Sequence, residues 1–211
     1  QKHAQEVAAR SKPKSEKEML GEELFQSLRD LRKEVAESEG IPPYLVFNDA
    51  TLKEMGAEMP VTPAAMKRVS GVGQKKFEQF GQIFIEAVVQ FIIQKVKGEG
   101  VKIKGSTYLL TYDLYQKGRS LEQISQERKL NLSTVESHIA HLYEKDFNID
   151  IYEFITEGEL AEIGKGVREI GHQSSIKPLF EHLEERIEYG RLRLGLAYWR
   201  KKEGETTASP S

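Results

Sequence analysis

The sequence contains no cysteine, and this absence removes several kinds of chemistry. Disulfide bonds, thiol nucleophiles and cysteine-ligated zinc sites are all excluded. Apolar runs long enough to span a bilayer are also missing, and no signal-peptide pattern opens the chain, which begins with Gln1. We therefore expect a cytoplasmic protein without a membrane partner, represented here by a piece of a longer chain.

A large net charge of one sign is missing as well. The 31 basic residues and the 33 acidic residues leave a formal charge of −2, so no overall field draws the chain toward nucleic acid. Any such affinity must come from a local patch. With 211 residues, of which 38% are hydrophobic and 30% charged, the composition is that of one large or two small globular domains.

What the sequence does contain is a succession of helical patterns. Leu24, Leu28, Leu31 and Val35 recur at helical spacing, and Thr62 is placed to cap a helix. No strong partner for a strand is visible, so we predict an all-α fold. The predicted parts are a linker (1–16), a small helical bundle (17–97), a hinge rich in Gly and Lys (98–105), a second helical domain (106–202) and a disordered tail (203–211).

The stretch "RVSGVGQKKFEQFG" at residues 68–81 places Gly71 and Gly73 around one valine. A nucleotide-binding loop would need a preceding strand and a fuller glycine pattern, and no P-loop motif occurs anywhere in the chain. Two interpretations remain open. The residues alone favour a plain tight turn, but a hairpin that offers the N–H groups of the next helix to a phosphate would need the same glycines.

Two longer stretches carry a resemblance to a known family. "LFQSLRDLRKEVAESEGIPPYLVFNDATLKEM" and "MPVTPAAMKRVSGVGQKKFEQFGQIFIEAV" closely resemble the HRDC domain, and in particular that of bacterial RecQ DNA helicases. The resemblance runs from about Leu20 to Ile93. It implies a small helical bundle that binds single-stranded DNA weakly, or docks on protein and branched DNA.

The resemblance also implies a set of DNA-binding residues. Tyr44 of the "PPY" motif is implied to stack on a base, although a half-buried core tyrosine would fit the same position. Basic and acidic residues are nearly balanced over 20–97, so we expect weak binding, and we expect Arg29, Arg32 and Lys33 to form a solvated polar face. The implied DNA-binding residues of this domain are Tyr44, Lys67, Arg68, Gly71, Gly73, Lys75 and Lys76.

The stretch "SLEQISQERKLNLSTVESHIAHLY" has the spacing of a helix-turn-helix. "SLEQ" and "STVE" both match the capping box, which predicts helices at about 121–128 and 134–145. The region 105–200 resembles the helix-turn-helix domain at the C-terminus of some RecQ helicases, and the motif also resembles that of response regulators. The predicted fold is thus an HRDC-like bundle followed by a helix-turn-helix domain.

The second helix of this motif has few residues suited to reading bases. It has no Arg or Lys before Lys145, so we expect contact with protein or with the DNA backbone only. His138 and His141 lack a convincing third ligand, and no metal site is expected. The residues expected to be exposed are Ser133, Thr134, Glu136, Ser137, His138, His141 and Glu144.

The C-terminal segment is basic and partly aromatic. Residues 189–200 fit a helix or a strand, and we favour a helix. Such a run is either a solvated face or, with Tyr189, Tyr198 and Trp199 interleaved, a grip on a nucleic acid strand. Arg191 and Arg193 are its candidate DNA-binding residues.

Together these resemblances imply a non-catalytic, nucleic-acid-binding accessory region of a RecQ-like ATP-dependent DNA helicase in DNA repair and recombination, associated with the nucleoid. They imply single-stranded or branched DNA as a weak partner and the helicase core in cis. ATP and magnesium would act in that core, with no cofactor in this fragment. Two alternatives stay open: a protein-docking module of the helicase, and the C-terminal part of an RNase D-like exonuclease. The second helix, which has no Arg or Lys before Lys145, argues against a third alternative, a transcription regulator.

One helix face calls for a partner. Val89, Ile93 and Val96 form an apolar stripe beside the expected core stripe of the long helix after the glycine turn. Burying each would stabilise the protein by about 1.5–3 kcal/mol. We expect this stripe to be covered by the second domain or by a second copy of the chain, that is, in a homodimer.

We expect the purified chain to hydrolyse no ATP and to cleave no nucleic acid, because the sequence has neither a P-loop nor a carboxylate pair placed for metals. Phosphate release and oligonucleotide cleavage, followed over a range of protein concentrations, measure this. Activity that scales with protein and survives repurification would contradict the prediction.

Overall fold

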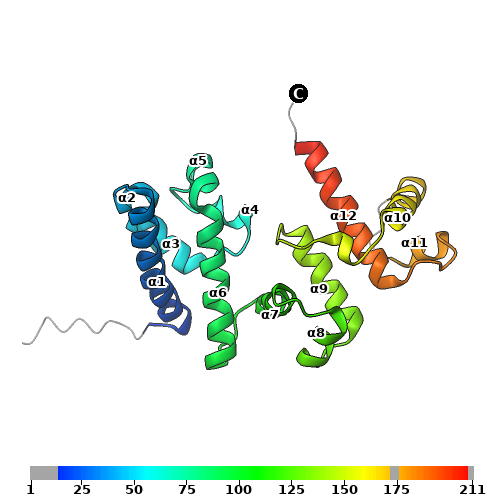
Figure 1. The fold of residues 1–211 in the computed structure, drawn as a ribbon, viewed down its shortest axis with the longest axis horizontal. Coiled ribbons are helices and arrows are strands. Elements are labelled where there is room, and N and C mark those ends of the chain that lie inside the picture. Colours follow the sequence, from blue (N-terminus) through cyan, green and yellow to red (C-terminus); the bar gives the residue numbers. More distant parts are fainter. Residues whose placement is uncertain (1–13, 172–175, 209–211) are drawn as a thin grey trace, which may run out of the picture. The chain divides into compact units, whose positions relative to one another are not determined.

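The structure is a computed structural model that describes residues 14–171 and 176–208, with side chains described up to residue 203. All regular elements in this part of the chain are helical, which confirms the predicted all-α class. Internal contacts divide the chain into two compact units, one ending at Phe91 and the other beginning at Ile92 (Figure 1). No helix in the described ranges is long and apolar enough to cross a membrane.

The first unit is a bundle around two long helices. Its core contains Leu24 and Leu28 from the first helix, and Phe47, whose ring meets the ring of Phe84 edge-on at 5.0 Å. Its elements are α1 (Glu16–Glu39), α2 (Pro43–Val46), α3 (Asp49–Glu58), α4 (Pro63–Met66), α5 (Gln74–Lys76), the π-helical turn η1 (Phe77–Gly81) and α6 (Gln82–Glu99).

Local capping chemistry explains where these helices begin. Ser15 forms a capping box with Glu18 at the start of α1, so that helix begins at the last residue of the expected linker, whose residues 1–13 lie outside the described ones. The Asn48 side chain accepts a hydrogen bond from the Thr51 N–H and starts α3. Thr62 caps α4, as predicted.

The second unit contains the helix-turn-helix and three further helices. Residues 189–200 are helical, as favoured, but α12 runs on to Ala208, so residues 203–208 of the expected disordered tail are helical. Its elements are α7 (Ser106–Gln116), α8 (Leu121–Arg128), α9 (Leu132–Glu144), the 3-10 turn η2 (Ile151–Glu153), α10 (Glu157–Ile170), α11 (Lys177–His182) and α12 (Tyr189–Ala208).

One of the two predicted capping boxes is correct. Ser120 and Gln123 form the box that starts α8. The box predicted at Ser133 is wrong, because α9 begins at Leu132 and its N-cap is Asn131. The chain leaves α8 through Lys129, whose φ of +52° reverses its direction at once, so the turn is too short for Ser133 to stand outside the helix.

Residues near the end of α6 are tied to α7. The carboxylate of Asp113 accepts hydrogen bonds from Lys97 and, at 2.8 Å, from Lys117. Burial disfavours its charge, but the two lysines outweigh this effect and lower the pKa of Asp113. This pairing explains why the last turns of α6 belong to the second unit. The expected hinge is thereby shortened to residues 100–105.

The second apolar stripe of α6 is buried over most of its length. Val89 and Ile93 are each 4% exposed, and Val96 is half-buried. These three positions are therefore largely shielded from solvent. These values hold for a single chain, so residues of the same chain bury Val89 and Ile93, and the expected second copy is not what covers them. The homodimer itself stays a prediction.

The turn before α5 requires glycine at one position and tolerates a side chain at the other. Gly71 has a φ of +85°, and a Cβ atom there would lie 2.3 Å from Thr51 Oγ1. Gly73 has an extended backbone with a φ of −77°, and a Cβ atom there would meet no other atom within 4 Å. The two glycines therefore have different roles.

We expect Gly71→Ala to lower the free energy of unfolding by about 1–3 kcal/mol, because it forces a left-handed conformation on alanine and displaces Thr51. The matched control is Gly73→Ala, which should cost less than about 1 kcal/mol, the value of a weakened N-cap. Urea denaturation followed by circular dichroism measures both. Equal losses in the two variants would contradict this assignment.

Candidate nucleic-acid interface

The glycine turn is anchored to α3 by hydrogen bonds. The Thr51 hydroxyl donates to the carbonyl oxygen of Ser70 at 2.8 Å, and the Ser70 N–H donates to the Glu54 carboxylate at 3.1 Å. The turn is thus a fixed part of the bundle, as the plain structural interpretation requires. Because its backbone is held rigidly, the residues that follow it are also held in place.

Tyr44 lies on the short helix α2 and is 65% exposed. The alternative of a half-buried core tyrosine is therefore wrong. Three residues later, the chain turns inward at Phe47, which is fully buried. Lys76 Nζ lies 5.8 Å from the centre of the Phe47 ring, so the end of α2 lies beside α5. Tyr44 and the lysines after the glycine turn consequently share one region of the first unit.

Two cations of this region have no ionic partner in the part of the chain that the structure describes. Arg68 and Lys75 are both exposed and form no hydrogen bond or ion pair there. Lys67 Nζ lies 4.5 Å from the centre of the Phe77 ring, a cation–π contact that leaves its charge uncompensated. We call Tyr44, Lys67, Arg68, Lys75 and Lys76 the aromatic–cationic face of the first unit.

Arg32 was expected to be solvated together with Arg29 and Lys33, and for Arg32 this prediction is wrong. Its side chain is 12% exposed, and its Nη1 donates to the Phe47 carbonyl oxygen at 2.9 Å and to Asp49 at 2.7 Å. The hydrogen bond from Arg32 lowers the pKa of Asp49. Spacing on α1 could not reveal this role, because the partners lie 15 and 17 residues away. Arg32 fixes the connection between α2 and α3, and with it the position of Tyr44.

The helix-turn-helix of the second unit is built from α7, α8 and α9, which pack on one another. The surface by which such a motif usually reads DNA lies on its second helix, here α9. Helix α12 packs along α9, and its Leu192, Leu196 and Ala197 are buried there with Ile139 and Leu142. Of the seven residues expected to be exposed on α9, only Ser133 is. Those half-buried or buried are Thr134, Glu136, Ser137, His138, His141 and Glu144.

Polar contacts fix α12 in this position. Arg193 donates to the Ser133 hydroxyl at 3.3 Å, and Arg200 donates to Glu144 at 3.2 Å. Arg191 donates to Glu159 of α10 at 2.6 Å, and this hydrogen bond raises the pKa of Arg191. The two arginines that the sequence offered for DNA thus contact the protein itself, and a phosphate would have to compete with those contacts.

His138 is buried rather than exposed. It is 8% exposed, and its Nδ1 lies 2.8 Å from the Thr111 hydroxyl and 3.4 Å from Arg128. Burial, followed by the charges of Arg128 and His141, lowers its pKa from 6.5 to about 4. Because a guanidinium only donates, the unprotonated ring nitrogen faces Arg128. No group of His and acidic residues in the described ranges is arranged to hold a metal ion.

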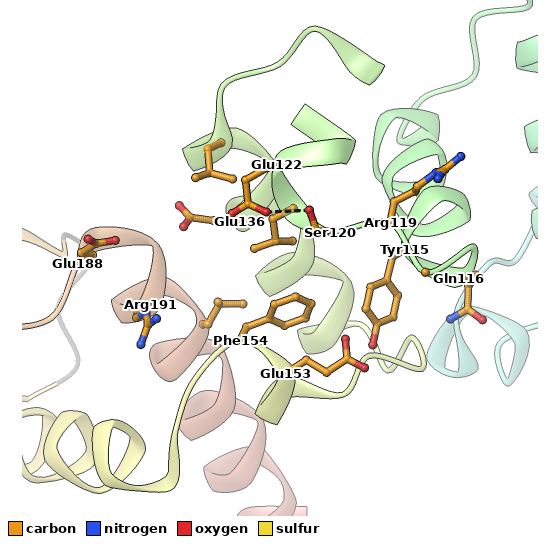
Figure 2. Close-up of a pocket in the computed structure, with 14 residues that line it drawn as sticks. Tyr115, Gln116, Arg119, Ser120, Glu122, Glu136, Glu153, Phe154, Glu188 and Arg191 are labelled. Atoms are coloured by element: carbon orange, nitrogen blue, oxygen red, sulfur yellow. Dashed lines mark hydrogen bonds between the residues drawn. The ribbon is translucent and has the colours of Figure 1, made fainter. Parts of the chain in front are cut away.

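A pocket of about 800 Å³ opens between α7, α8, η2 and the start of α12. Figure 2 shows the side chains of Glu122, Glu136, Glu153 and Glu188 around it, with Arg191 among them. Burial raises the pKa of Glu136. Four carboxylates repel phosphate, so this pocket is a poor site for nucleic acid.

Comparison with known families agrees with this architecture. Residues 21–88 match the family model of the HRDC domain, and residues 107–196 match that of a helix-turn-helix domain. The chain therefore carries an HRDC domain followed by a helix-turn-helix domain, both of them accessory, non-catalytic types. The resemblance found in the sequence is confirmed for both halves.

The closer resemblance to RecQ is also confirmed, for the HRDC segment. It is similar to the ATP-dependent DNA helicase RecQ of Pasteurella multocida (52% identical over 68 residues), of Haemophilus influenzae (52% over 66) and of Bacillus subtilis (42% over 67). Each alignment covers 31–32% of this chain and 11% of the relative. The chain thus spans about a tenth of the length of the curated relatives it matches.

We expect the second unit to lose stability as the pH falls from about 6.5 to about 4. His138 has a lower pKa when folded than when unfolded, so the unfolded chain takes up the proton first. The stabilisation present above pH 6.5 is about 3 kcal/mol and is lost on acidification. His141, whose pKa burial also lowers, adds in the same direction. Urea denaturation of the whole chain, followed by the fluorescence of Trp199, measures it.

The variant that checks the cause is His138→Asn, whose side-chain oxygen can accept the same hydrogen bonds without titrating near pH 5. It should show a clearly flatter pH dependence. Superimposable pH profiles for the His138 variant and the unchanged chain would contradict the assignment.

Proposed function

We propose that this chain is a non-catalytic, nucleic-acid-binding accessory region of a RecQ-like ATP-dependent DNA helicase. The observation that carries the proposal is the 52% identity of its HRDC segment to RecQ helicases, combined with an exposed Tyr44 in a unit whose Arg68 and Lys75 have no ionic partner among the described residues. In this proposal the helicase core lies in cis on the same parent protein. ATP and magnesium act in that core, and the parent protein works on DNA at the nucleoid, in repair and recombination.

The aromatic–cationic face of the first unit suits a single strand. An exposed ring offers a surface on which any base stacks, and nearby cations meet the phosphates. Arg68 and Lys75 form no ion pair with a carboxylate in the described part of the chain. A DNA phosphate that binds to them therefore releases counterions without breaking an ion pair. Because only a few such cations are present, binding is weak and depends strongly on salt.

The second candidate function is docking to a protein partner. It is favoured by Leu45, an exposed apolar side chain beside Tyr44, since such a pair also suits a protein surface. The RNase D-like alternative has no observation in its favour beyond the HRDC domain itself. DNA binding and protein docking make opposite predictions for Tyr44, and one experiment separates them.

We expect Tyr44→Ala to weaken binding of single-stranded DNA by about 1–3 kcal/mol, the value of one base stacked on an aromatic ring. Arg68→Ala and Lys75→Ala should each reduce the slope of log affinity against log salt by about 0.7. Fluorescence polarisation of a labelled thymidine oligonucleotide, repeated over a salt series, measures both quantities. Branched and duplex DNA in parallel titrations show which structure is preferred.

The matched control is Lys17→Ala. Lys17 is exposed in the first turn of α1, the end of that helix remote from α2, and should leave the slope unchanged. A folded Tyr44→Ala protein that binds every DNA form as tightly as the unchanged chain would rule out the stacking role. Protein docking would then be the better account of the exposed pair.

A further inference from the structure

The second unit contains an aromatic pocket at the junction of η2, α10 and α12. Its volume is about 310 Å³, within the range of about 300–1,000 Å³ that is usual for small-molecule sites. Three aromatic side chains line it, Tyr152, Tyr198 and Trp199, together with Arg168 and Glu157. We call these five residues the aromatic pocket.

The rings of the aromatic pocket meet edge to face and not face to face. The centres of Tyr152 and Tyr198 are 6.4 Å apart at an angle of 67°, and those of Tyr198 and Trp199 are 5.5 Å apart at 88°. Tyr152 is 54% exposed. No two of these rings stack on each other, and Tyr152 is the most exposed of the three, so its ring is the one most open to a flat ligand.

Trp199 is held rigidly at this site. Its Nε1 donates to the carbonyl oxygen of Leu160 at 2.8 Å. A Cβ atom at Gly164 would lie 2.3 Å from the indole, so the ring rests directly on the backbone of α10. A ring that is already fixed loses little conformational entropy when a ligand binds to it.

Cations surround these rings. The guanidinium of Arg168 lies 5.7 Å from the centre of the Trp199 ring. Lys202 Nζ lies 5.3 Å from the same ring and 5.6 Å from that of Tyr198. Of the described residues that line the pocket, two are charged, the basic Arg168 and the acidic Glu157. The lining is therefore less acidic than that of the 800 Å³ pocket, where four carboxylates outnumber two arginines.

We propose that the aromatic pocket binds an unstacked base of a single-stranded polynucleotide, while Arg168 and Lys202 meet the flanking phosphates. Aromatic rings interleaved with cations are the general means of holding single strands without sequence preference. This places the nucleic-acid contact of the helix-turn-helix unit away from α9, whose usual DNA-reading surface α12 covers. The proposal does not depend on Tyr44 and goes beyond the function proposed for the first unit.

The chain offers a direct probe, because Trp199 is its only tryptophan. We expect a thymidine oligonucleotide of about 15 residues, long enough for one such site, to quench the tryptophan emission of the whole chain. Tyr152→Ala should weaken the affinity measured from this quenching about 5- to 150-fold, the loss of one stacked base. Tyr152→Phe should restore it, and Lys202→Gln should reduce its salt dependence.

The matched control is Tyr189→Ala. This tyrosine is also exposed, but it lies on α12 and packs on Phe180, outside the pocket. The variant should leave the quenching unchanged. Tyr44→Ala should also leave it unchanged, which separates this site from that of the first unit. A uridine oligonucleotide in a parallel titration distinguishes RNA from DNA as the source of the strand.

Two results would overturn the proposal. One is binding seen by polarisation with no change in tryptophan emission, which would leave the first unit as the site of contact. The other is quenching that Tyr152→Ala does not weaken. Absence of any binding by either oligonucleotide would overturn both this proposal and the one for Tyr44.

Discussion

The packing of α12 against α9 is the constraint on which the second unit depends. It buries Leu192, Leu196 and Ala197 in the core of the unit, and Arg193 and Arg200 donate hydrogen bonds to α9 at its edges. A helix placed there cannot leave without exposing that core. The second helix of the helix-turn-helix is therefore packed against α12, and most of the polar residues that such a helix would present to DNA are half-buried.

The same packing determines how the positive charges of the chain are used. Several arginines of the second unit form ion pairs, as Arg186 does with Glu162 and Arg191 with Glu159. In the first unit Arg68 and Lys75 have no such partner in the described part of the chain. Two weak sites on one chain bind a strand more tightly than either alone, provided that the linker lets both engage it.

Much of the fold was predictable because local chemistry decides it. Thr62, Asn48 and Ser120 cap the helices that their side chains indicate, and the apolar spacing of α1 gives its buried face. The failures occurred where a distant partner decides. Arg32 contacts residues at the end of α2, and His138 is covered by α7 and α8, so helical spacing alone predicted both as exposed.

The sequence by itself determined the all-α class, the HRDC resemblance with Tyr44 and its neighbouring lysines, and the existence of a helix-turn-helix. These follow from short-range periodicity, capping and motif spacing, which need no knowledge of the partner surface. Only the tertiary structure decided that α12 packs on α9, that Arg191 and Arg193 contact the protein itself, and that the Tyr152 ring meets that of Tyr198. Each of those outcomes joins residues that lie tens of positions apart, and a burial pattern along one helix cannot specify which other helix lies on it.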